Sequence, residues 1–414
     1  MSGVTDAGST GLLLAGPAVA RTFACALLGR LAYGVLPLCF LFTVRDAAGS
    51  LALAATASAL LGIATLAMPV HARLLDRLGQ RRVLPVVAGC WSALLVTGAV
   101  LARGDHPPAT WLVLAPLIGL SSPVLGPSMR AQWREIAPEG PQRRRAYALD
   151  SVGEESLYLV GPIVAGAVLA LGPAWVGLLV AAALVWCGVL GLALSPYRPP
   201  VGVVGAPSAP SGSPGARAPS GAAAIGGLVA SLALFGAGSA AAFVGIAALA
   251  DRAGRPGLAG LIEAAVAIGA VAGGLVWARH GRSHPAGRVL ALLLVVLALA
   301  QALVALVAGP LAAAVVLGLG GLTTSPVFVV AYAAVDERVA PARRTEMSTW
   351  VNVGVNGGSA LGTAVAGLAA GGGAALPFAL AAALSAGAAG VAAAWGRMSP
   401  WPSTSPTTPQ PTSS

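Results

Sequence analysis

The sequence has 414 residues, of which 57% are hydrophobic and 9% are charged, whereas about a quarter of a soluble domain is charged. Too few polar side chains remain to cover soluble domains, and the hydrophobicity is too high for an intrinsically disordered chain, so both classes are excluded. The net charge of +10 comes entirely from an excess of arginine, because the chain contains no lysine. The arginines occur in short clusters between apolar runs, which argues against nucleic-acid binding and favours a polytopic helical membrane protein.

Twelve apolar runs are each long enough to cross about 30 Å of hydrocarbon. The predicted spans are 22–44, 48–70, 83–102, 110–130, 146–171, 174–195, 223–249, 256–278, 287–308, 311–333, 346–371 and 374–396. They divide the chain into an N-terminal segment (1–21), a six-helix half (22–195), a flexible linker rich in Pro, Gly and Ser (196–222), a second six-helix half (223–396) and a disordered tail (397–414). The N-terminal segment lacks the positive charge of a secretory signal, so we expect no cleaved leader.

The distribution of arginine predicts the orientation of the spans. If the first span starts in the cytoplasm, 19 arginines lie in inner segments and 4 in outer loops, with Arg30 inside a span. Positively charged loops face the cytoplasm. We therefore expect a multi-pass protein of the plasma membrane, with the N-terminus, linker and tail all cytoplasmic.

The two halves also repeat one another. Residues 72–80 align with residues 274–282 at an offset of 202, and both Ser122-Pro123 and Ala137-Pro138 recur at an offset of 203, as Ser325-Pro326 and Ala340-Pro341. Two parallel six-helix repeats joined by a cytoplasmic linker are the layout of major facilitator transporters.

The loop between the second and third spans carries the most specific motif. Residues 76–82, Asp-Arg-Leu-Gly-Gln-Arg-Arg, resemble the signature loop of the major facilitator superfamily, although Ala72 replaces its first glycine and the second copy has Ala278 in place of the acid. The resemblance implies an all-α membrane protein whose two six-helix halves are related by a pseudo-twofold axis. It also implies that Asp76, Arg77, Gly79 and Arg81 form a conformational latch, with Asp76 at the N-terminus of the eleventh helix near residues 345–347. Without the repeat, a short basic loop would explain the motif equally well.

Charged residues inside the spans are costly, so they are normally paired or functional. Arg30 lies about eight residues into the first span, and Glu154 and Glu155 lie about as deep in the fifth. We expect Arg30 to pair with one of these glutamates, either as a static salt bridge or with the glutamate exchanging a proton during transport. Asp150 is expected to pair at the membrane surface with the arginines at 143–145. Glu263 stands alone in the eighth span and is a candidate for contact with substrate or proton.

Two further patterns concern helix shape and the substrate path. Gly161, Pro162 and Gly166 resemble the fifth-helix motif of the superfamily's antiporters, which favours export, although the fourth span lacks the buried arginine of proton-coupled members. Asn352 and Asn356 form a polar stripe on the eleventh span, which predicts hydrogen bonds between helices or, second, a substrate path.

No phosphate-binding loop, catalytic triad or metal-spaced histidine cluster occurs in the sequence. We therefore expect no enzyme activity, cofactor or metal. The sequence predicts a monomeric, proton-coupled exporter of small organic compounds that binds no nucleic acid; a metabolite importer or uniporter, and a lipid flippase of the same fold, remain alternatives.

Overall fold

The computed structural model describes residues 16–199, 221–280, 285–306, 309–339 and 344–398. Within them, twelve helices are long and apolar enough to cross a membrane, which confirms the predicted number of spans. The predicted linker and tail fall almost entirely outside the described residues.

The first half contains six spans, of which two begin with proline and two are interrupted. They are α2 (Pro17–Ala48), α3 (Leu51–Ala64) continued by η1 (Thr65–Ala67) and α4 (Met68–Leu78), α5 (Gln80–Leu101), α6 (Ala109–Leu120) continued by α7 (Leu125–Ile136), α8 (Pro141–Leu171) and α9 (Val176–Ala193). Proline at the first helical position costs nothing because its missing N–H has no partner there in any helix. This explains why α2 begins at Pro17, five residues before the start at residue 22 that was predicted from hydropathy.

The second half repeats this order. Its spans are α10 (Gly221–Arg252), α11 (Gly257–His280), α12 (Ala286–Leu306), α13 (Pro310–Gly321) continued by α14 (Thr324–Arg338), α15 (Arg344–Ala370) and α16 (Ala375–Met398). The fourth span of each half is broken at its Ser-Pro landmark: Ser122-Pro123 lies between α6 and α7, and Ser325-Pro326 lies at the start of α14. The sequence repeat is therefore also a repeat of helix breaks.

Each half is a bundle with its own centre. In the first half α2 packs against α8 and α9, and in the second half α10 packs against α15 and α16. Trp91, Trp111 and Trp133 are fully buried in the first bundle. Many large apolar side chains are exposed, among them Val86 and Leu292 at 65% each, as expected for helices whose outer faces meet lipid.

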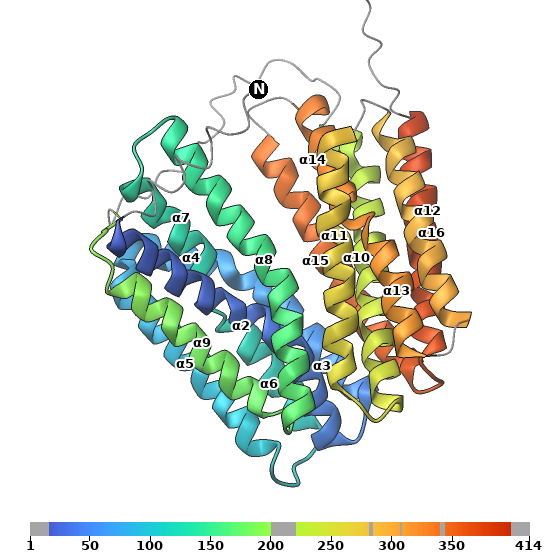
Figure 1. The fold of residues 1–414 in the computed structure, drawn as a ribbon, viewed down its shortest axis with the longest axis horizontal. Helices are drawn as coiled ribbons and strands as arrows, with labels where there is room; N and C mark the ends of the chain where they lie inside the picture. The colour runs from blue at the N-terminus through green and yellow to red at the C-terminus, as the bar shows by residue number, and fades with distance from the viewer. Residues whose placement is uncertain (1–15, 200–220, 281–284, 307–308, 340–343, 399–414) are drawn as a thin grey trace, which may run out of the picture.

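The halves meet through two helix pairs, α3 with α15 and α8 with α11. Figure 1 shows the two bundles inclined to each other, meeting at the end that carries the α2–α3 turn and diverging toward the end from which α8 starts. Small residues make the meeting possible: Gly166 of α8 contacts Gly257 and Gly260 of α11, and Gly367 of α15 contacts Ala55 of α3. Among the described residues, these close contacts between the bundles lie at the end where the two bundles meet.

Candidate functional site

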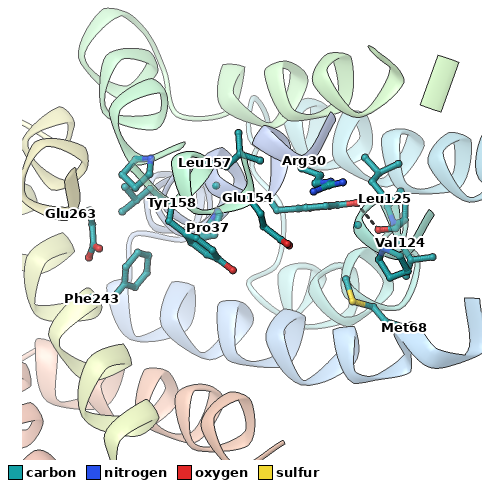
Figure 2. A pocket seen from close by; sticks show the side chains of 17 residues that line it. Arg30, Pro37, Met68, Val124, Leu125, Glu154, Leu157, Tyr158, Phe243 and Glu263 are labelled. Carbon is teal, nitrogen blue, oxygen red and sulfur yellow. Dashed lines mark hydrogen bonds between the residues drawn. The ribbon is translucent and has the colours of Figure 1, made fainter. Parts of the chain in front are cut away.

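A cavity of about 400 Å³ lies between the two halves. The first half supplies most of its wall, from α2, from the break between α6 and α7, and from α8; the second half supplies Phe243 of α10 and Glu263 of α11 (Figure 2). The residues that line it are Arg30, Tyr33, Gly34, Pro37, Leu38, Met68, Pro123, Val124, Leu125, Gly126, Pro127, Glu154, Leu157, Tyr158, Pro162, Phe243 and Glu263. A volume of this size suits a small organic molecule.

Four charged side chains of the first half form a connected chain, of which Arg30 and Glu154 line the cavity. Arg30 Nη2 donates to Asp150 Oδ1 at 2.7 Å, Arg130 Nε lies 3.6 Å from Asp150 Oδ2, and Arg130 Nη2 donates to Glu154 Oε2 at 3.1 Å. The two ends of the chain differ in exposure: the Arg30 and Asp150 side chains are 3% and 1% exposed, whereas those of Arg130 and Glu154 are 55% and 36% exposed. The chain therefore connects a desolvated ion pair to a water-accessible carboxylate.

The partner predicted for Arg30 was wrong. Arg30 pairs with Asp150, and neither Glu154 nor Glu155 contacts it; the expected pairing of Asp150 with the arginines at 143–145 was wrong for the same reason. Asp150 lies on the buried face of α8, where only a buried cation can compensate its desolvation, and Arg30 is that cation. Glu155 points to the exposed side of the helix and does not line the cavity.

Arg30 keeps unused donors. Its Nε and Nη1 are buried and donate to no acceptor within the described residues. Beside it, the Tyr33 hydroxyl donates to the carbonyl oxygen of Pro123 at 2.5 Å, an oxygen that the break between α6 and α7 leaves without a helical partner. The helix break thus positions one wall of the cavity.

Glu263 is the cavity's carboxylate from the second half. Its side chain is half-buried, and among the described residues it makes no hydrogen bond or ion pair. In the view of Figure 2 it projects into the cavity on the side of Phe243 and Tyr158, away from Arg30. Glu263 thus lines the cavity, and its predicted contact with substrate or proton stays a prediction.

A second cavity of about 480 Å³ continues the first toward the closed end. Tyr33, Pro37, Met68 and Phe243 line both cavities, so the two are contiguous. The second is mostly apolar; its other lining residues are Leu36, Phe40, Ser58, Leu61, Gly62, Thr65, Trp91, Ile118, Gly119, Ser122, Ala240 and Thr363. One charged chamber and one apolar chamber thus share a boundary.

The fifth-helix motif lies where α8 crosses two partners. Gly161 packs on Gly34 of α2, so that a Cβ added to Gly161 would lie 2.6 Å from Gly34 Cα, and Gly166 packs on α11. Pro162 lines the cavity between them, and α8 continues through it as one helix. The small residues of this motif therefore allow α8 to pack closely against α2 in its own half and against α11 in the opposite half.

The predicted polar stripe does not reach this site. Asn352 Oδ1 accepts a hydrogen bond from the Tyr332 hydroxyl at 3.1 Å, which links α15 to α14, and neither Asn352 nor Asn356 lines either cavity. Of the two interpretations, hydrogen bonding between helices fits Asn352.

The signature loop is anchored within the first half. Gly79 adopts a φ of +86°, which favours glycine, at the turn from α4 to α5. Arg81 donates to the carbonyl oxygen of Ser195 at 2.6 Å, just beyond the C-terminus of α9, where a cation is favourable. Asp76 and Arg77 are exposed. The predicted latch stays a prediction, because the side chains at 344–346 lie outside the described residues.

Several residues of the site escaped the sequence analysis. Arg130 was only one of the 19 arginines counted in the inner segments, and Tyr33, Tyr158 and Phe243 were not predicted to have a role. The position of Arg130 in the sequence could have indicated its role. The turn at 137–140 joins α7 to α8, and Arg130 lies about as far before this turn as Asp150 lies after it. The two residues are therefore at a similar depth in the membrane. For the aromatic residues no comparable charge pattern exists. No group of His, Cys, Asp and Glu within the described ranges is arranged to hold a metal ion.

Comparisons with known proteins agree with this geometry. The model of the Major Facilitator Superfamily matches residues 21–224. No curated protein matches the chain. Among solved structures, the nucleoside transporter NupG is similar with a TM-score of 0.67 at 14% identity, over 92% of this chain and 98% of that one.

Two further solved structures share the fold. A bacterial homologue of the iron transporter ferroportin, in an inward-facing state, has a TM-score of 0.67 at 15% identity over 91% of this chain and 98% of its own. The peptide transporter POT in complex with sulfate has a TM-score of 0.63 at 18% identity over 91% of this chain and 92% of its own. At these identities the likeness concerns the fold alone. With the family model over its first half and the fold over its length, the chain belongs to the Major Facilitator Superfamily, and it is a multi-pass membrane transporter, not an enzyme.

Proposed function

We propose that this protein is a proton-coupled exporter of small organic compounds that works by alternating access. The observation that carries the proposal is the cavity whose walls come from both halves, with Arg30 and Glu154 on one side and Glu263 on the other. Because the halves meet at one end and diverge at the other, a tilt of one against the other exchanges which end of the cavity is open.

The carboxylates of the site support proton coupling. Asp150 faces Arg30 of α2 and Arg130 of α7, Glu154 faces Arg130, and Glu263 faces no cation among the described residues. A carboxylate that changes exposure or partner as the halves move takes up and releases protons on opposite sides. Glu154 and Glu263, the two carboxylates that line the cavity, one from each half, are the proposed carriers, with Asp150 as the buried member of the charged chain.

The proposal includes an orientation. With arginine-rich loops in the cytoplasm, both termini are cytoplasmic, the protein resides in the plasma membrane, and the present conformation is open to the cytoplasm. The Asp76 loop then lies on the cytoplasmic side and secures the alternate, outward-open state. One chain contains both halves of the cavity, so a monomer suffices.

A pH-gradient transport assay tests the function. The purified protein is reconstituted in proteoliposomes, and uptake from a panel of organic compounds is followed with and without a proton gradient, for the parent and for Glu154→Gln, Glu155→Gln and Glu263→Gln. We expect gradient-driven transport in the parent, its loss in Glu154→Gln or Glu263→Gln, and its retention in Glu155→Gln.

The same assay distinguishes the alternatives. Gradient dependence that persists in all three variants overturns the assignment of the proton carriers, and transport without gradient dependence in the parent indicates a uniporter. Gradient-driven movement in the same direction as the protons indicates an importer. Movement of labelled phospholipid between leaflets, without solute counterflow, indicates a flippase.

A further inference from the structure

We propose that the substrates are amphipathic organic cations, whose positive group binds at Glu263 and whose apolar body occupies the second cavity. The inference rests on the proposed function, since it names the class of compound that the same site takes. It is carried by three features of the described residues: the charge of the first cavity, the aromatic side chains beside Glu263, and the apolar chamber behind them.

The first feature is an excess of carboxylates. The charged chain contains two guanidinium groups, of Arg30 and Arg130, and two carboxylates, of Asp150 and Glu154, so it balances itself. Glu263 adds a further carboxylate from the opposite half, and no described cation contacts it. An unpaired carboxylate in a low-dielectric site is costly, and a bound cation removes that cost.

No other charge on the helices that pack against α11 supplies this partner. Those helices are α8, α10, α13 and α14, and only α8 brings a charged group, Glu154, into the same cavity. Two further α8 charges lie inside the helix: Asp150 is buried and paired with Arg30, and Glu155 is exposed and does not line the cavity. The other described charges on these helices lie toward their ends: Arg143, Arg144 and Arg145 on α8, Asp251 and Arg252 on α10, and Asp336, Glu337 and Arg338 on α14. The environment of Glu263 is therefore acidic and aromatic.

The second feature is the pair of rings that share the cavity with Glu263. Tyr158 of α8 is 66% exposed and Phe243 of α10 lines both cavities, and Figure 2 shows both rings on the side of Glu263. A carboxylate with aromatic faces is a binding arrangement for organic ammonium and related cations, because the ring faces carry negative electrostatic potential. Small inorganic cations are strongly hydrated and prefer several oxygen ligands, whereas this arrangement offers one carboxylate and two rings, so it favours an organic cation.

The third feature selects for an apolar body. The second cavity begins at Phe243 and extends past Trp91 and Ile118, with about 480 Å³ of mostly apolar space. None of the residues that line this chamber is charged, and Phe243 joins it to the cavity that holds Glu263.

An anionic substrate is the competing possibility, because Arg30 has two unused donors. However, Arg30 is only 3% exposed, its charge is already paired with Asp150, and Glu154 lines the same cavity. An anion at Arg30 would therefore lie close to two carboxylates, which makes the cation the better fit.

A matched pair of probes tests the proposal. Tetraphenylphosphonium and tetraphenylborate have nearly the same size and shape and opposite charge, and neither titrates. Binding of each is measured on the purified full chain by calorimetry, with protein-free micelles subtracted. We expect the phosphonium to bind and the borate to bind at least tenfold more weakly, with phosphonium affinity reduced about tenfold or more in Glu263→Gln and several-fold in Phe243→Ala.

The controls distinguish a loss of phosphonium binding from a loss of folding and from a loss of transport. Asp105→Asn removes the same charge from an exposed loop and should leave the affinity unchanged, whereas Glu263→Asp, which keeps the carboxylate, should retain part of it. Equal binding of the borate, or parental phosphonium affinity in a Glu263→Gln protein with parental melting temperature, overturns the proposal. Binding needs no gradient, so the two proposals fail separately. Phosphonium binding that depends on Glu263, without gradient-driven transport, rejects the proposed function but not this inference. Gradient-driven transport of anions, and of no cations, rejects this inference but not the proposed function.

Discussion

Arg45 at the end of α2 forms an ion pair with Asp251 at the end of α10, and the pair joins the two halves where they meet. Arg45 also donates to the neighbouring Asp46. The side chains of Arg45 and Asp251 are 26% and 28% exposed, so the pair is partly shielded from water. It lies at the closed end of the molecule and is expected to break when that end opens.

Removing this pair should shift the protein away from the present conformation. A partly exposed ion pair contributes up to about 1 kcal/mol, which changes the ratio of two conformations up to about fivefold. We expect Arg45→Ala and Asp251→Ala each to increase the labelling rate of a reporter cysteine at Ser58, which lines the second cavity. The native cysteines are replaced, and an impermeant maleimide is added on the Arg45 side.

Exchanging the two charges provides the control for the Arg45–Asp251 ion pair. The double variant Arg45→Asp/Asp251→Arg restores the attraction, so its labelling rate should return toward that of the parent. Labelling at the parental rate in both single variants would show that the pair does not hold the closed end.

The buried pair of Arg30 and Asp150 should dominate the stability of the first half. Asp150→Asn leaves Arg30 buried without a counter-charge, and breaking a buried pair in this way costs about 3–5 kcal/mol. The double variant Arg30→Gln/Asp150→Asn removes both charges and should recover most of the lost thermal stability. Arg130→Gln serves as the comparison: the Arg130 side chain is 55% exposed, so the loss of its charge should cost under about 1 kcal/mol.

Thermal unfolding in detergent, followed by tryptophan fluorescence, measures these differences. A melting temperature of Asp150→Asn equal to that of Arg130→Gln would contradict the assignment of Arg30 and Asp150 as a desolvated pair.

The glycine contact between α8 and α11 should be intolerant of a methyl group. A Cβ on Gly260 would overlap the Pro162 carbonyl oxygen and would lie 2.5 Å from Gly166 Cα, so the helices must separate to admit it. We expect Gly260→Ala to raise labelling of the Ser58 reporter and to lower transport. Gly357→Ala, on α15 with no atom within 4 Å of the added Cβ, should leave both unchanged; an equal effect of the two substitutions would mean that helix propensity rather than the contact is responsible.

The spans were predictable because hydrocarbon thickness fixes their length, and the repeat was predictable because the Ser-Pro breaks recur at one offset. The charge pairs were not predictable, since pairing depends on how each helix is rotated and tilted. A single step along α8 separates Glu154, in the cavity, from Glu155, outside it, and one turn separates Glu154 from Asp150, the actual partner of Arg30. Phe243 reaches the site only through the packing of one half on the other, which no local pattern contains.

The signature loop leads to a prediction of opposite sign to that for the Arg45–Asp251 pair. Asp76 is exposed in this conformation and makes no hydrogen bond or ion pair with another described residue. Asp76→Asn should therefore leave this conformation unchanged. If the loop secures the alternate state by placing Asp76 at the N-terminus of α15, the substitution removes about 0.3–1 kcal/mol from that state alone. Labelling of the Ser58 reporter from the Arg45 side should then fall by up to about fivefold, and transport should slow, while the melting temperature stays near the parental value. Combining Asp76→Asn with Asp251→Ala should return labelling toward the parental rate, because each substitution weakens a different end of the same equilibrium; a rise in labelling for Asp76→Asn alone would reject the latch.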